Sequence, residues 1–265
     1  QPIRPIDTVD IDAVQKVEML KDIEKYFHPD RAKWYSQRGV PYRRGILLHG
    51  PPGTGKSSVS TALAGHFESN MYIVNLREVQ GEKGLKDLFV KPKKGDIVLM
   101  EDIDTAGIVR DENAEVEDED TGLKRKRNQY DKGVTLSGLI NVIDGVCDRS
   151  DGVLLIMTTN NPESLDKALV RPGRIDKQYH LGHVAQAVAE IIFKRIYQDD
   201  EATLAKGSQQ VQPHIAELAK QFAAKVPDNK ITPAEIQAHL IASDCPEQAV
   251  ERADRWVADL LVAKE

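Results

Sequence analysis

One short stretch constrains the fold of this chain more than any other. Residues 50–57 read GPPGTGKS, the pattern GxxxxGK followed by serine, between an apolar strand pattern at residues 46–48 and an alanine-containing helical pattern. Glycines let the backbone wind tightly, so that successive N–H groups and the N-terminus of the following helix point at phosphates. The stretch therefore predicts a phosphate-binding loop for ATP, with these candidate residues: Gly50, Pro51, Pro52, Gly53, Thr54, Gly55, Lys56, Ser57 and Ser58.

Two side chains of this loop have predicted chemical roles. The Lys56 ammonium would neutralise the β and γ phosphates, and the Ser57 hydroxyl would bind Mg²⁺. A phosphate-binding loop occurs in kinases, GTPases and mechanical ATPases alike, so the rest of the chain must decide among these classes.

The order of apolar patterns predicts an α/β fold. Short β-type runs recur at residues 45–49, 71–76, 96–100, 153–159 and 178–181, with helical patterns between most of them. This alternation predicts a five-stranded parallel sheet flanked by helices. After residue 182 the strand patterns stop, and amphipathic helical patterns follow at residues 184–197, 215–224, 232–242 and 246–263. The predicted domains are a nucleotide-binding α/β core at residues 1–182 and a small helical lid at residues 183–265.

A charged segment interrupts the predicted core. Seven acidic residues lie within residues 111–120, and residues 124–127 read KRKR. Because residues 107–133 offer almost no apolar side chains to bury, we expect a solvated, mobile insertion, and a partner-binding element is the alternative.

Composition excludes several classes of protein. The formal net charge is −6 and acidic and basic residues are mixed, so the chain has no broad cationic face for nucleic acid. The two cysteines, Cys147 and Cys245, are isolated, and the histidines show no zinc-binding spacing. No apolar run approaches the roughly 18 residues that cross a bilayer, so we expect membrane attachment only through a segment outside this chain.

Two acids follow the third strand pattern in an unusual order. Residues 97–106 read IVLMEDIDTA, with Glu101 before Asp102, whereas strands coupled to nucleotide hydrolysis usually end with aspartate first. Since side chains alternate along a strand, position should set each role: Glu101 near Mg²⁺, and Asp102 orienting the attacking water. The alternative is a nucleotide-gated scaffold that binds ATP with little turnover.

Three further polar residues complete the candidate site. Asn160 ends the apolar run VLLIMTTN, where it either orients the attacking water or only satisfies the end of a strand. The stretch RPGR then supplies Arg171 and Arg174, which alone would be solvated surface residues. Following the loop, the acids and Asn160 in this order, the two arginines fit an arginine-finger pair.

Together these motifs resemble the AAA+ ATPases, through GPPGTGKS, LMEDID, TTNNPESLDKALVRPGRID and the helical tail. Within that superfamily the chain is similar to the mitochondrial Rieske-protein translocase family, the inner-membrane chaperone that assembles respiratory complex III. This second resemblance is carried by WY at residues 34–35, RGVPYRRG at 38–45, the reversed acids, TLSGLINVIDGV at 135–146 and TPAEIQ at 232–237.

The resemblance implies a homo-oligomeric ring, heptameric in that family, that acts on a protein client, the folded Rieske iron–sulfur protein. It also implies a location on the matrix side of the mitochondrial inner membrane, with a transmembrane helix and a family-specific domain upstream. By motif, residues 53–58 would hold the phosphates, Asn160 would be the first sensor, and Arg171 and Arg174 would reach the ATP of the neighbouring subunit.

The chain departs from common AAA+ patterns in two places. Residues 77–84 read REVQGEKG and lack the aromatic pore loop of unfoldases, which fits a family that moves a folded substrate. Residues 232–235 replace a glycine-alanine step that many relatives place near the nucleotide, so the sequence does not identify a second-sensor residue that contacts the nucleotide. The remaining alternatives are a soluble remodelling ATPase and a clamp-loading ATPase, the latter disfavoured by the acidic charge.

Overall fold

The computed structural model describes residues 4–79, 81–105, 115–117, 124–126, 134–145, 151–197 and 213–264. The chain divides into two compact units, each described here by itself. The sheet unit comprises Gln1–Ile6, Val17–Gly50 and Lys56–His180, and the helical unit comprises Asp7–Lys16, Pro51–Gly55 and Leu181–Glu265. The domain boundary between residues 182 and 183 stays a prediction.

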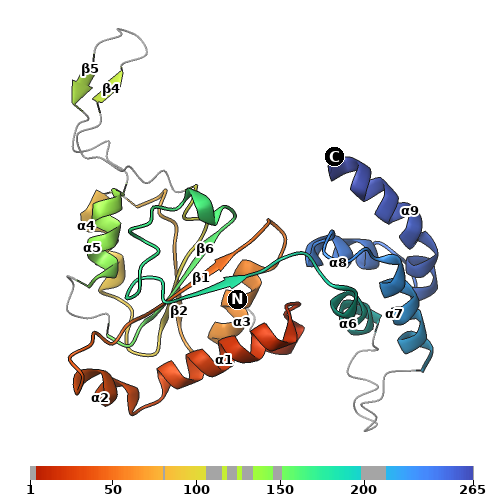
Figure 1. Ribbon diagram of the computed structural model, residues 1–265, viewed down its shortest axis with the longest axis horizontal. Helices are drawn as coiled ribbons and strands as arrows, with labels where there is room; N and C mark the ends of the chain where they lie inside the picture. Colours follow the sequence, from red (N-terminus) through yellow and green to blue (C-terminus); the bar gives the residue numbers. More distant parts are fainter. Residues whose placement is uncertain are drawn as a thin grey trace. The chain divides into compact units, whose positions relative to one another are not determined.

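A five-stranded parallel sheet forms the centre of the sheet unit, which confirms the predicted α/β fold (Figure 1). Its strand order is β2-β3-β6-β1-β7, so β1 pairs with both β6 and β7. The second strand ends two residues before the predicted pattern does, because Leu76 is buried in a turn beyond it. The strands are β1 (Arg44–His49), β2 (Met71–Val74), β3 (Ile97–Met100), β6 (Leu154–Thr159) and β7 (Lys177–His180).

Helices cover both faces of this sheet. Helices α4 (Gly81–Phe89) and α5 (Leu136–Ile143) lie on one face, and α1 (Ala13–Phe27) and α3 (Lys56–His66) lie on the other (Figure 1). A short helix, α2 (Arg31–Ser36), precedes β1, and single 3₁₀ turns are η1 (Ile6–Thr8) and η2 (Pro162–Ser164).

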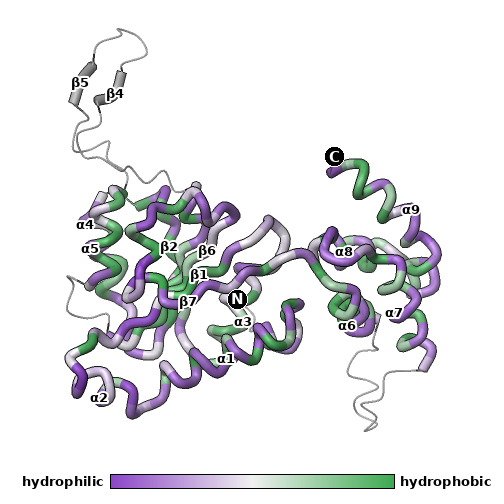
Figure 2. The backbone as a smooth tube through the Cα atoms, in the orientation of Figure 1, coloured by the Kyte–Doolittle hydropathy of each residue, from purple (hydrophilic) through white to green (hydrophobic). Residues whose placement is uncertain are grey.

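The inner strands β3 and β6 and the middle of β1 are buried on both faces and are mainly apolar, whereas the edge strands β2 and β7 are partly exposed. Alternate strand residues such as Leu47, Met100 and Met157 share one hydrophobic core with Leu85 of α4 and Leu139 of α5. Their sequence neighbours in the strands are also almost fully buried, among them Ile46, Leu48, Leu99 and Ile156. Figure 2 shows this concentration of hydrophobic residues along the strands.

The helical unit contains the four helices that the amphipathic patterns predict. They are α6 (Gln186–Tyr197), α7 (Pro213–Lys225), α8 (Pro233–Ile241) and α9 (Pro246–Lys264), packed around a core that includes Phe193 and Phe222. Residues near the N-terminus belong to this unit as well. The buried carboxylate of Asp10 forms a two-point ion pair with Arg195 of α6 and accepts a hydrogen bond from Gln237 of α8 at 2.7 Å.

The predicted mobile insertion, residues 107–133, lies outside the described residues except for two short strands. These are β4 (Glu115–Glu117) and β5 (Lys124–Lys126), which pair antiparallel. Across the described ranges, none of the helices combines the length and the apolar character that crossing a membrane requires.

Candidate functional site

The GPPGTGKS loop has a backbone that needs its glycines. Gly50, Gly53 and Gly55 have φ angles of 141°, 78° and 93°, which residues with a side chain rarely adopt. Helix α3 begins within this stretch, at Lys56. The glycines in the sequence therefore stand at three positions where the backbone has a positive φ angle, as expected for a phosphate-binding loop.

Lys56 is a buried cation at the carboxyl end of the sheet. Its ammonium donates to the carbonyl of Gly50 at 2.7 Å and to Oδ1 of Asn160 at 2.8 Å, and 7% of the residue is exposed. Burial lowers the pKa of Lys56, while the carboxylates of Asp102 and Asp104 act in the opposite direction. The cation is thus held by carbonyl and amide oxygens, with two carboxylates near it.

The two reversed acids have different partners. The Ser57 hydroxyl donates to Oε1 of Glu101 at 2.5 Å, and the amide nitrogen of Asn160 donates to Oδ1 of Asp102 at 3.2 Å. The hydroxyl and carboxylate oxygens of Ser57 and Glu101 are the kind of ligand that Mg²⁺ prefers, so this pair fits the predicted metal site. Lys56, Ser57, Glu101, Asp102 and Asn160 therefore lie together in the sheet unit.

The neighbouring strand β6 fixes the turn that carries the acids. Asp102 has a φ of 46°, a left-handed conformation that is costly for a residue with a side chain and that often occurs at functional sites. Its N–H donates to Oγ1 of Thr158 at 3.0 Å, and the N–H of Ile103 donates to the carbonyl of Thr158 at 3.0 Å. The carbonyl of Asp102 accepts from both the N–H and the hydroxyl of Thr105.

The arginine-bearing turn packs against the first strand at a glycine. Asp176 accepts hydrogen bonds from the N–H of Gly45 at 3.0 Å and from the N–H of Gly173 at 2.8 Å. A Cβ atom on Gly45 would overlap the carbonyl oxygen of Arg174. The chain therefore places Arg171 and Arg174 through a close backbone contact that only glycine permits.

The two candidate finger arginines differ in their surroundings. Arg171 is exposed, and its side chain forms no hydrogen bond with the described residues. Arg174 instead forms a two-point ion pair with Asp144, at 2.8 Å and 2.6 Å, and donates to the carbonyl of Ala168. The hydrogen bonds to Asp144 raise the pKa of Arg174.

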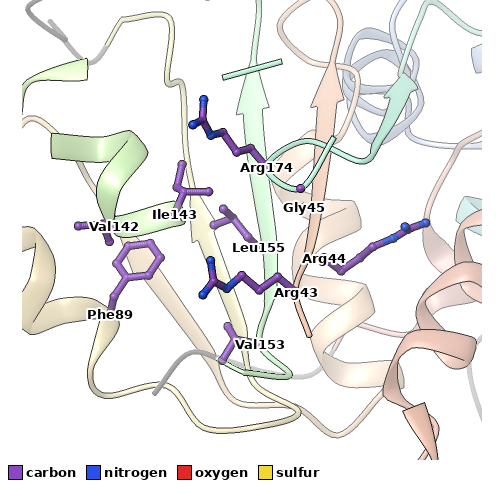
Figure 3. Close-up of a pocket in the computed structure, with 10 residues that line it drawn as sticks. Arg43, Arg44, Gly45, Phe89, Val142, Ile143, Val153, Leu155 and Arg174 are labelled. Carbon is purple, nitrogen blue, oxygen red and sulfur yellow. The ribbon is translucent and has the colours of Figure 1, made fainter. Parts of the chain in front are cut away.

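Arg43 completes this corner of the sheet unit (Figure 3). Its guanidinium donates to the carbonyls of Asp144 and Gly145, which end helix α5, where a cation is favoured by the helix dipole. Arg43 and the adjacent Arg44 point to opposite faces of the sheet, and Arg44 pairs with Asp22 of α1 (Figure 3). Arg43 and Arg174 both line a small cavity whose other walls are mainly apolar.

The other loop residues have local partners. The Thr54 hydroxyl donates to the carbonyl of Pro51 at 2.8 Å, and the Ser58 hydroxyl accepts from Arg4 at 2.8 Å. In the helical unit, the carbonyl of Gly53 accepts from the N–H of Ala234, in the first turn of α8, at 3.3 Å. Thr232 and Glu235 form a capping box at the start of α8.

Three supporting residues lie inside recognised motifs, but the motifs do not show what these residues do. Thr158 and Asp176 belong to the stretch at residues 158–176 and Asp144 to that at 135–146, and each acts through a partner far away in the chain. The one signal is the stretch TT at residues 158–159, two polar residues that end an otherwise apolar strand and are fully buried.

Comparisons with known proteins agree with this geometry. Residues 46–183 match the ATPase family associated with various cellular activities (AAA). Residues 186–255 match the ATPase lid domain described as mitochondrial chaperone BCS1-like. Both matches follow the chain order of the loop, the acids, the arginines and the four C-terminal helices.

Individual relatives cover most of this chain. It is 35% identical over 254 residues to the probable mitochondrial chaperone BCS1-B of Dictyostelium discoideum, with 90% of this chain and 52% of that protein covered. It is 33% identical over 255 residues to the human mitochondrial chaperone BCS1, with 95% of this chain and 55% of that protein covered. The protein HYPER-SENSITIVITY-RELATED 4 of Arabidopsis thaliana is 32% identical over 246 residues, with 92% and 39% covered. The chain spans about half the length of the two BCS1 chaperones. It belongs to the AAA ATPase family and carries the BCS1-like ATPase lid domain.

Proposed function

We propose that this chain hydrolyses ATP to ADP and phosphate with the help of Mg²⁺. The observation that carries the proposal is the separation of the two acids, Glu101 with Ser57 and Asp102 with Asn160. One acid serves the metal and the other serves the attacking water, which are the two tasks that hydrolysis assigns to acids at this place.

Each residue has a defined role in the proposed reaction. Lys56 neutralises the β and γ phosphates, and Mg²⁺, held by Ser57 and Glu101, supplies further positive charge there when bound. Asp102 orients a water and accepts its proton while the water oxygen attacks the γ phosphorus. The bond between that phosphorus and the oxygen bridging to the β phosphate breaks, which leaves ADP and phosphate. Asn160 fixes the positions of the Asp102 and Lys56 side chains relative to each other through its two hydrogen bonds.

We further propose that the working form is a homo-oligomeric ring in which Arg171 or Arg174 completes the site of a neighbouring subunit. The resemblance to the ring-forming Rieske-protein translocases, heptameric in that family, supports this proposal. So does the exposed Arg171 side chain, which no described residue binds. Mass measurement of the ATP-bound protein by native mass spectrometry tests for a ring.

The proposed client is a folded protein, the Rieske iron–sulfur protein, at the matrix side of the mitochondrial inner membrane. The resemblance to the Rieske-protein translocases supports the client and the membrane side. The lid match and the names of the BCS1 relatives support a mitochondrial chaperone. Binding of the full-length protein to a folded Rieske domain, compared with the same domain unfolded, tests the client. Protease protection in intact and ruptured mitochondria tests the location.

The alternative function is a nucleotide-gated scaffold that binds ATP with little turnover. Its motivation is the unusual order of the two acids, Glu101 before Asp102. Phosphate production from ATP distinguishes the two functions, because a scaffold binds ATP without sustained turnover. In parallel, Lys56→Ala should lower ATP affinity in a calorimetric titration by a factor of about 10 to 100, the loss expected for hydrogen bonds to a charged group. Lys83→Ala, which removes an exposed lysine of α4, is the control and should bind ATP normally. Unchanged affinity of Lys56→Ala would contradict the assignment of the loop.

A further inference from the structure

A cavity in the sheet unit adjoins the two catalytic acids on the side away from β1. It has a volume of about 430 Å³ and is bordered by Glu101 and Asp102 together with Asn75, Arg77 and Thr105. A water molecule in the liquid occupies roughly 30 Å³, so this space admits an ion much larger than water. Its residues Asn75, Arg77, Asp102 and Thr105 are exposed, so the cavity is open to solvent.

Arg77 is the one cation on the described wall of this cavity, and a turn after β2 fixes its backbone. The side-chain oxygen of Asn75 accepts from the N–H of Arg77 at 3.2 Å, and the Asn75 amide nitrogen donates to Glu78 at 2.7 Å. The Arg77 Nε donates to the carbonyl of Thr105 at 2.9 Å. Among the described residues, no carboxylate forms an ion pair with Arg77, so its terminal nitrogens keep their capacity to bind an anion.

The direction of the proposed reaction brings an anion to this wall. In an in-line displacement the attacking and leaving oxygens lie on opposite sides of the γ phosphorus. The phosphate formed therefore lies toward the residue that orients the water, Asp102, and away from ADP. Asp102 borders the cavity, so the cavity is the space next to the new phosphate.

The charges on the wall change during the same step. Asp102 accepts the proton of the attacking water and becomes neutral. Glu101 accepts a hydrogen bond from Ser57 and would bind Mg²⁺ when the metal is present. Arg77 then dominates the wall electrostatically. A guanidinium binds phosphate through charge-assisted hydrogen bonds in a planar fork.

We propose that this cavity is a binding site for the inorganic phosphate product, and that Arg77 is the residue that holds the phosphate before it leaves. The inference rests on the proposed ATP hydrolysis. It assigns a role to Arg77, the first residue of the stretch at 77–84, to which the sequence alone assigns no function.

The test uses added inorganic phosphate as the probe and three variants of the full chain. Arg77→Gln removes the charge, Arg77→Lys keeps the charge but loses the planar fork, and Lys83→Gln removes the exposed charge of a nearby helix as the matched control. Two quantities are measured for each: the inhibition of ATP hydrolysis by phosphate, and the affinity of phosphate for the protein saturated with ADP and Mg²⁺. Thermal unfolding and ADP affinity establish that each variant is folded.

Arg77→Gln should weaken phosphate binding and phosphate inhibition by about tenfold, the loss expected for one charge-assisted hydrogen bond. Arg77→Lys should weaken them by less than about threefold because a lysine still binds phosphate as a point charge. Lys83→Gln should match the unmodified protein.

Two results would overturn the inference. Phosphate binding by Arg77→Gln within a factor of about two of the unmodified protein would remove Arg77 from the site. An equal loss in Arg77→Lys and Arg77→Gln would mean that Arg77 acts only by anchoring Thr105. Absence of phosphate production by the unmodified protein would instead contradict the proposed function itself, which the hydrolysis measurement reports separately.

Discussion

Each of the two carboxylates after β3 has its own partner. Glu101 has one methylene more than aspartate, and its carboxylate reaches the Ser57 hydroxyl at the start of α3. Asp102 has a shorter side chain, and its left-handed backbone turns it away from the strand direction, toward Asn160. The reversed pair of acids therefore presents one carboxylate to Ser57 and the other to Asn160, which is the division that the proposed reaction requires.

Exchanging each acid for its amide separates these tasks. Asp102→Asn should retain ATP binding and lower turnover by a factor on the order of 10² to 10⁴, because it removes the proton acceptor. Glu101→Gln should chiefly weaken Mg²⁺-dependent binding, because an amide is a weaker metal ligand than a carboxylate. Turnover and Mg²⁺ dependence are measured for both variants, with Asp87→Asn, an exposed acid on α4, as the control. The assignment is wrong if Glu101→Gln abolishes turnover at normal metal affinity while Asp102→Asn stays active.

At the scale of elements, the sheet edge near the arginines depends on one close backbone contact. The N–H of Gly45 in β1 donates to Asp176, and the N–H of Asp176 donates back to the carbonyl of Gly45 at 2.9 Å. The carbonyl of Arg174 occupies the space that a side chain at Gly45 would need. The placement of the arginine-bearing turn is therefore encoded in a strand far from it in the sequence.

Gly45→Ala should disturb this contact. Forcing a methyl group into a packed site costs about 1 to 3 kcal/mol of unfolding free energy, and the displaced turn should also lower ATP turnover. Gly84→Ala is the control, since its Cβ would meet only Val79 at an ordinary contact distance and alanine favours helix, with an expected gain of up to about 1 kcal/mol. Urea unfolding and phosphate release measure the two effects. Equal unfolding free energies of Gly45→Ala and the unmodified protein would show that the turn at Arg174 moves aside without loss of stability.

The sequence predicts the elements better than it predicts their neighbours. The five apolar runs and the four C-terminal helical patterns lie within a few residues of the observed elements, because periodicity and apolar content are local properties. Strand order is not local: β3 and β6 are adjacent in the sheet although the charged segment and α5 separate them in the chain. The support of Asp102 by Thr158 follows from that order, and the two motifs that contain these residues do not show that they are in contact. The ion pair of Arg174 with Asp144 is hidden from the sequence for the same reason.

For the whole molecule, the question is which of the two arginines is available to a neighbouring subunit. Arg174 is held by Asp144, so in this chain it serves as a fixed part of the sheet unit, whereas Arg171 is unbound by the described residues. If the working form is a ring with heterologous contacts, each site combines one chain's loop and acids with the next chain's arginines. Loss of the loop and loss of an arginine would then disable different sites, and this difference can be measured.

Mixed rings test this arrangement. Lys56→Ala disables the site in its own chain. If Arg174 leaves Asp144 to reach the neighbour's ATP, Arg174→Ala disables the site of the neighbour, and each homogeneous ring should then be inactive. In random equal mixtures, roughly a quarter of the contacts should join an intact loop to an intact arginine, and ATP turnover should return in proportion. The mixture of Lys56→Ala with Asp102→Asn is the control: both changes act on the chain's own site, so no contact in that mixture is intact. Turnover at different mixing ratios is measured beside native mass spectrometry, which establishes that mixed rings form. Arg171→Ala mixed in the same way shows which arginine acts across the contact. Mixed rings that show no recovery with either arginine variant would place both arginines outside the neighbour's site.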